Sequence, residues 1–85
     1  MATLKVGNFE LSTVETLSVR NNLEWRSCVF VRRTGEGQLL EILNEVGHGD
    51  TWLQAREAAL VIGKEFAESL DPDESVESRQ RRRGW

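Results

Sequence analysis

Residues 23–33 read LEWRSCVFVRR, and their alternation decides the fold class of the chain. The odd-numbered positions carry Leu, Trp, Ser, Val and Val, whereas the even-numbered ones carry Glu, Arg, Cys, Phe and Arg. Side chains two positions apart share a face of a β-strand, so this period predicts a strand with one face toward a core. We expect Trp25 to lie in that core, beneath Ile62 and Phe66.

The segment that follows predicts a hairpin partner for this strand. Residues 34–37 are Thr-Gly-Glu-Gly, a turn with two conformationally free glycines, and residues 38–46 have the length and apolar content of a second strand. Setting Leu40, Ile42 and Val46 inward gives the second strand a core face. Because the connecting turn is short, the two strands should pair antiparallel.

A helix is expected after the hairpin. Thr51 and Gln54 have the spacing of a capping box, and Pro72 disfavours helical backbone at the preceding residue, so the helix should end near Leu70. Between these limits apolar residues recur every three or four positions and form one face for the sheet: Ala55, Ala58, Ala59, Ile62, Phe66 and Leu70. The small alanines favour a close approach of helix and sheet.

Two glycines lie between the second strand and the helix, in Gly47-His48-Gly49. We interpret them as turn residues, because a strand-to-helix turn requires the conformational freedom that glycine provides. The alternative is an anion site at the helix N-terminus, which the carboxylate of Asp50 opposes.

The first twenty-two residues predict one further strand. Residues 4–11 are apolar on both sides of Gly7-Asn8, which forms either a tight turn or a bulge within one longer strand. We expect a short edge strand here, and Asn21-Asn22 indicates a second turn. The fold class is therefore a small two-layer α+β domain, with an antiparallel two- to three-stranded sheet followed by one C-terminal helix in β-β-β-α order.

The 85 residues divide into one domain and a tail. Residues 1–70 form the single α+β domain and carry the whole net charge of −3, because an acidic block and a basic block cancel in residues 71–85. The tail is too polar to bury, so we expect it to be flexible.

Composition excludes several functional classes. Hydrophobic residues make up 39% and charged residues 29%, which is ordinary globular usage, and no apolar run approaches the length of a membrane span. Cys28 and His48 are the only residues of their kinds, so a thiolate metal site and histidine-based catalysis have little support. We expect a cytoplasmic, non-enzymatic protein without a cofactor, a bound metal or a membrane partner.

The first functional hypothesis is a small protein-interaction or regulatory module whose partner is another protein or a second copy in a weak homodimer. Three residues spaced by seven form a second apolar stripe on the predicted helix, away from its core face: Leu53, Leu60 and Ala67. Trp85 is a further candidate contact, because tryptophan is enriched at interface hot spots.

The alternative hypothesis is a nucleic-acid-binding accessory domain. Arg26, Phe30 and Arg32 share one strand face, and the tail adds a basic cluster suited to phosphate contacts: Arg79, Arg81, Arg82 and Arg83. In element order alone, residues 4–70 resemble the small three-strand-plus-helix DNA-binding domains of the Apetala-2 and integrase N-terminal types. That resemblance implies a sheet face that reads the major groove. Glutamates on the same and the neighbouring strand oppose these arginines and favour the first hypothesis.

Overall fold

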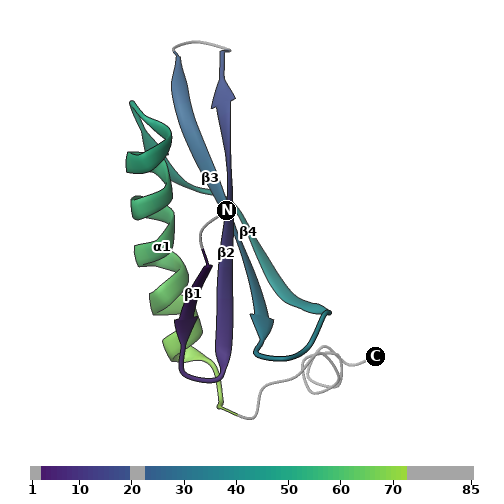
Figure 1. The fold of residues 1–85 in the computed structure, drawn as a ribbon. Coiled ribbons are helices and arrows are strands. Elements are labelled where there is room, and N and C mark those ends of the chain that lie inside the picture. The colour runs from purple at the N-terminus through teal and green to yellow at the C-terminus, as the bar shows by residue number, and fades with distance from the viewer. Residues whose placement is uncertain (1–2, 20–22, 73–85) are drawn as a thin grey trace, which may run out of the picture.

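The computed structural model describes residues 3–19 and 23–72, and in them the chain forms an antiparallel sheet with a helix on one side. The elements are β1 (Thr3–Val6), β2 (Phe9–Ser18), β3 (Glu24–Arg33), β4 (Leu39–Gly49) and α1 (Trp52–Ser69). The strands lie side by side in chain order (Figure 1). The predicted α+β class is confirmed, with four strands where the sequence indicated two or three.

The additional strand comes from the N-terminal segment. Gly7 and Asn8 form a two-residue turn that pairs Val6 with Phe9, so the tight turn, and not the bulge, is the correct alternative. Gly7 has a φ of 58°, a conformation that glycine adopts at the first central position of hairpin turns at little cost.

β2 and β3 form the longest regular part of the sheet. Their register is unbroken from Phe9 opposite Arg33 to Ser18 opposite Glu24. Figure 1 shows this hairpin projecting past the start of α1. The turn predicted at Asn21-Asn22 lies outside the described residues.

β4 departs from the predicted alternation. Leu40 is buried and Val46 packs against the core, as expected, but Ile42 is 43% exposed and lies opposite Phe30. Leu43 takes the inward place instead. The cause is the first of two irregularities in β4, where Leu40 has no partner because Leu39 lies opposite Arg32 and Glu41 opposite Val31. The second irregularity, which we call the β4 bulge, sets residues 44–46 opposite Cys28. Side-chain patterning reveals neither departure from period two.

The helix begins and ends as predicted. The hydroxyl of Thr51 accepts a hydrogen bond from the backbone N–H of Gln54 at 3.1 Å, and the Gln54 side chain accepts one from the N–H of Asp50 at 2.9 Å. In the standard capping box the side chain of this glutamine would bond to the N–H of Thr51; here it bonds to the N–H of the preceding residue, Asp50. Leu70 has extended backbone and closes the helix with a bond to the carbonyl of Ala67.

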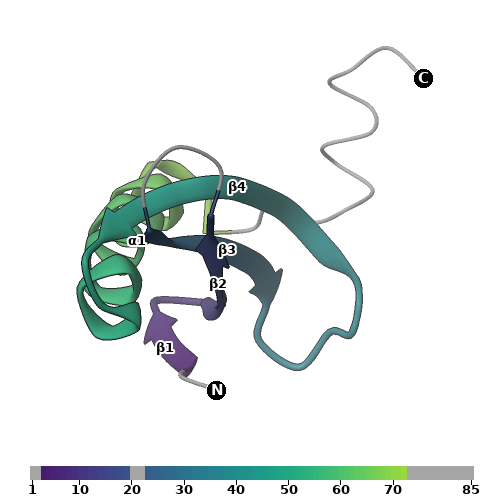
Figure 2. The same ribbon diagram turned by 90° about the horizontal axis from the view of Figure 1, so that it is seen from above.

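Small residues form the contact between α1 and the sheet. Figure 2 shows α1 on one side of the sheet. The buried positions of the helix are Ala55, Ala59, Gly63 and Ala67. A Cβ added to Gly47 of β4 would lie 2.6 Å from the Cβ of Ala59 and would also overlap the carbonyl of Ala55. Gly47 therefore serves close packing within β4, and its φ is not positive, which corrects the prediction of a turn glycine.

The rotation of the helix differs from the prediction. Ile62, assigned to the core face, is 41% exposed, whereas Ala67, assigned to a free stripe, is 3% exposed. Leu60, from the same stripe, packs against the core. Trp25 is only half-buried and pairs with Gly49, close to the start of α1, so its placement beneath Ile62 was wrong.

We predict that Gly47→Ala lowers the free energy of unfolding by about 2 to 3 kcal/mol, because the methyl group must push the helix off the sheet. Gly37→Ala is the matched control, since a Cβ there meets nothing within 4 Å. Urea denaturation measures both variants. Equal losses for the two would show that close packing at Gly47 does not limit stability.

The side chain of Thr13 is the subject of a second prediction. It is 2% exposed, and its hydroxyl has no hydrogen-bond partner among the described residues. Thr13→Val removes the unsatisfied hydroxyl and keeps the shape, so it should stabilise the domain by about 1 kcal/mol. The same change at exposed Thr3 should alter thermal and urea unfolding little. A destabilised Thr13→Val variant would mean that the hydroxyl is satisfied in solution.

Candidate functional site

The side of the sheet that faces away from α1 is not covered by any element within residues 3–19 and 23–72. We call it the open face. Strand register and alternation assign its members: Thr3 and Lys5 of β1; Glu10, Ser12, Val14, Thr16 and Ser18 of β2; Glu24, Arg26, Cys28, Phe30 and Arg32 of β3; and Leu39, Ile42 and His48 of β4.

The middle of the open face is apolar. Phe30 lies opposite Ile42 on one side, and the next row places Val14 opposite Cys28. Val14 and Ile42 are 41% and 43% exposed, a high value for β-branched residues in the interior of a strand. An exposed apolar strip rimmed by charge is typical of a protein interface.

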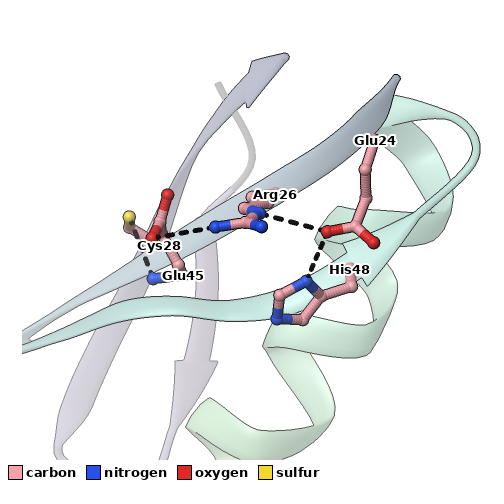
Figure 3. Close-up of polar contacts among 5 residues, drawn as sticks. All are labelled: Glu24, Arg26, Cys28, Glu45 and His48. Atoms are coloured by element: carbon pink, nitrogen blue, oxygen red, sulfur yellow. Dashed lines mark hydrogen bonds and ion pairs between the residues drawn. The ribbon is translucent and has the colours of Figure 1, made fainter. Parts of the chain in front are cut away.

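One end of the open face carries a network of charged side chains, drawn in Figure 3. The Nε of Arg26 lies 3.1 Å from Oε1 of Glu24, and its terminal nitrogen lies 3.4 Å from Oε2 of Glu45. Nδ1 of His48 lies 2.9 Å from the same Glu24 oxygen. Because an ionised carboxylate only accepts hydrogen bonds, the proton of this contact is on Nδ1 of His48.

The β4 bulge positions this network. Glu45 has a φ of 49°, a left-handed conformation that a residue with a side chain rarely adopts. Its backbone N–H donates to the sulfur of Cys28 at 3.2 Å, and its carboxylate turns toward Arg26. The strained residue is thus held by contacts to β3 at both its backbone and its side chain.

The charges at this end shift the titration of one carboxyl group. The hydrogen bond from His48 and, after it, the one from Arg26 lower the pKa of Glu24 below its ordinary value of 4.5. The ionised form of Glu24 is therefore the form that the folded chain favours.

The residues predicted for nucleic-acid binding are only partly brought together. Arg26, Phe30 and Arg32 do share the open face, but Arg26 is engaged by two glutamates and Arg32 lies directly opposite Glu10. The four tail arginines, Arg79, Arg81, Arg82 and Arg83, lie outside the described residues. The resemblance to three-strand DNA-binding domains rested on β-β-β-α order, and the sheet has a fourth strand.

The residues predicted for partner binding do not form one surface. Leu53 is exposed near the start of α1, Leu60 is half-buried against the core, and Ala67 is buried. Trp85 lies outside the part of the chain that the structure describes. The helix stripe proposed from sequence is therefore incorrect as a continuous exposed strip.

The sequence analysis missed two members of the site. Val14 lies in a strand whose alternation is irregular, and Ile42 was placed inward because the irregularity at Leu40 was not visible in the sequence. Glu45 was recognised as a charge opposing the arginines, which the ion pair with Arg26 confirms, but not for its backbone conformation. A non-glycine left-handed residue has no reliable sequence signal.

A hollow lies between the β1–β2 turn and the end of α1. It has a volume of about 310 Å³ and is lined mainly by apolar groups, with the amide of Asn8 and the carboxylate of Glu68 at its margin. Asn8 donates to the carbonyl of Pro72 at 3.1 Å. A catalytic site needs an acid, a base or a nucleophile that converge on one point, and this hollow has only one amide and one carboxylate. Its apolar lining is better suited to holding an apolar side chain of a partner.

No group of three or more histidine, cysteine, aspartate or glutamate side chains gathers to hold a metal within the described ranges. The one helix found there is too polar to cross a membrane. The chain matches no protein-family description, and no curated protein or solved structure shows significant similarity to it. The candidate site therefore rests on its own geometry.

The lowered pKa of Glu24 predicts a pH dependence of stability. Because the folded pKa lies below the unfolded one, the stabilisation is fully present above about pH 4.5 and is lost as the pH falls through the folded pKa. Glu24→Gln should therefore unfold more easily than the parent chain at pH 7, and the difference should shrink in acid. Glu36→Gln, in the β3–β4 turn, is the control. A Glu24→Gln effect that is constant from pH 7 to pH 3 would contradict the prediction.

Proposed function

We propose that this chain is a non-enzymatic interaction domain that binds a partner protein across the open face of its sheet. The observation that carries the proposal is the exposure of Val14 and Ile42 beside Phe30, in the middle of a sheet face that no described element covers. Burying this apolar strip is favourable for any partner with a matching surface, at about 25 cal/mol per Å².

The charges of the open face favour a protein over a nucleic acid. Lys5, Arg26 and Arg32 are balanced there by Glu10, Glu24 and Glu45. Nucleic-acid affinity comes mainly from an excess of cationic groups that contact phosphates, and this face has no such excess. Protein partners present both signs of charge, so alternating charges supply specificity for them.

The size of the open face limits the area that a partner can bury on it. Strands about 4.8 Å apart and rising about 3.3 Å per residue give a face roughly 19 Å wide and 33 Å long, or about 600 Å². A standard stable interface buries about 800 Å² on each partner. The open face alone would therefore form an interface below the standard size, a class that includes many transient complexes.

A cytoplasmic location belongs to the same proposal. Cys28 is a free thiol whose sulfur accepts a hydrogen bond from the backbone, and small domains in oxidising compartments are usually stabilised by disulfides.

Site-specific photocrosslinking tests the proposed function. A benzoylphenylalanine at Ile42 should give a discrete adduct with a protein in cells that naturally express the chain. The same group at Lys64, on the exposed side of α1, is the control and should give little adduct. Equal labelling at both positions, or none at Ile42, would refute binding through the open face.

Titration with single- and double-stranded DNA distinguishes the alternative hypothesis. We expect no binding at low salt for the full chain. Binding that weakens steeply with salt and is lost in Arg32→Gln would instead support the nucleic-acid function.

A further inference from the structure

The outer edge of β2 is only half covered. β1 pairs with Phe9–Ser12, and within residues 3–19 and 23–72 no strand lies beside Thr13–Ser18 on that side. This stretch is regular, since its register with β3 continues without a bulge to Ser18. An uncovered edge of six residues presents backbone donors and acceptors to any strand that approaches it.

Hydrogen-bond alternation fixes which backbone groups point outward. Val6 and Phe9 flank a two-residue turn, so Phe9 directs its N–H and C=O toward β1. The carbonyl of the neighbouring Asn8 accepts instead from Thr34, on the β3 side. The same alternation continues along β2. The residues that direct their backbone N–H and C=O groups to the free edge are therefore Thr13, Glu15 and Leu17.

The edge has little of the usual protection against pairing. Thr13–Ser18 contains one charged residue, Glu15 on the helix side of the sheet, but no lysine, no proline and no bulge, and its threonines and valine favour extended backbone. It also exposes an apolar side chain on each face of the sheet, with Val14 41% and Leu17 46% exposed. Both features are typical of a strand that is paired in its functional state.

We infer that this edge pairs with the same edge of a second copy of the chain, forming a symmetric dimer through an antiparallel β2–β2 contact. In such a pair, outward-directed residues must lie opposite outward-directed residues, so Thr13, Glu15 and Leu17 can only oppose one another or equivalent positions. Directly opposed residues share a face, and the two helices therefore lie on the same side of one continuous sheet.

Charge selects the register. Of the two registers centred on the free edge, one places Glu15 opposite Glu15 of the second copy, and opposed like charges destabilise a strand pair. The other places Thr16 on the two-fold axis, with Glu15 opposite Leu17 and Val14 opposite Ser18 of the second copy. This register sets no like charges directly opposite each other and sets two threonines against each other. The two Leu17 side chains, and likewise the two Glu15 carboxylates, are then diagonal neighbours about 7 to 8 Å apart.

A second copy of the chain is a better partner for this edge than an unrelated strand, because the same segment, Thr13–Ser18, then forms both strands of the contact. Its length also fits, since β1 limits the free edge at Ser12 and the β2 strand of the second copy ends at Ser18. The dimer leaves both open faces on the same side of the sheet. Val14 lies in the dimer contact, but Phe30 and Ile42 lie outside it, so crosslinking at Ile42 tests the partner surface separately.

A cysteine at the two-fold axis tests the register. Thr16 faces away from the helix, and its non-hydrogen-bonded pairing across the axis places the two Cα atoms about 4.5 Å apart, within the range for a disulfide. In a Cys28→Ser background, Thr16→Cys should form a disulfide dimer under mild oxidation much faster than Thr34→Cys, whose exposed turn lies far from the axis. Equal rates for the two variants would overturn the inference.

The oligomeric state of the full chain gives the second readout. Sedimentation equilibrium at millimolar concentration should show a mass approaching twice 9.7 kDa. Thr16→Lys sets two ammonium groups against each other at the axis and should return the mass to 9.7 kDa, whereas Thr34→Lys should leave the dimer intact. A monomeric parent chain, or a dimer that Thr16→Lys does not weaken, would overturn the inference while leaving the crosslinking test at Ile42 unaffected.

Discussion

The contact between the backbone of β4 at Gly47 and the helix at Ala55 and Ala59 is the constraint on which the rest of the structure depends. No side chain separates the two elements there, so the helix lies closer to the sheet than larger residues would allow. The small-residue series continues through Gly63, which packs against Val29 and Leu11, to Ala67. The large apolar side chains then fill the flanks, where Phe66 and Leu70 pack against the core.

This arrangement explains which parts of the fold the sequence predicts. The period-two pattern of residues 23–33 and the Thr51–Gln54 cap are local signals, and both are found where they were expected. The rotation of the helix was missed because a hydrophobicity pattern gives Ile62 more weight than Gly63. Close packing against a backbone reverses that order, since it selects the residue with the smallest volume.

The candidate site likewise has parts that the sequence predicts and parts that it does not. The contact of Arg26 with Glu24 was predictable, because residues two positions apart in β3 share a face of the sheet. The outward position of Ile42 depends on the irregularity at Leu40, and that of Glu45 depends on the β4 bulge at residues 44–46. Both irregularities reflect how β4 packs on β3 and α1, so the sequence of β4 alone has no pattern that predicts them.

The lengths of the elements explain why an edge stays uncovered. An α-helix of 18 residues extends about 27 Å, whereas a strand of ten residues extends about 33 Å, and the start of α1 is tied to the end of β4. The β2–β3 hairpin therefore extends past the start of the helix and leaves Leu17 exposed. A four-residue β1 cannot reach this region either, because its pairing ends at Ser12. Close packing of small residues fixes the helix in place and leaves the apolar hairpin end at Leu17 exposed.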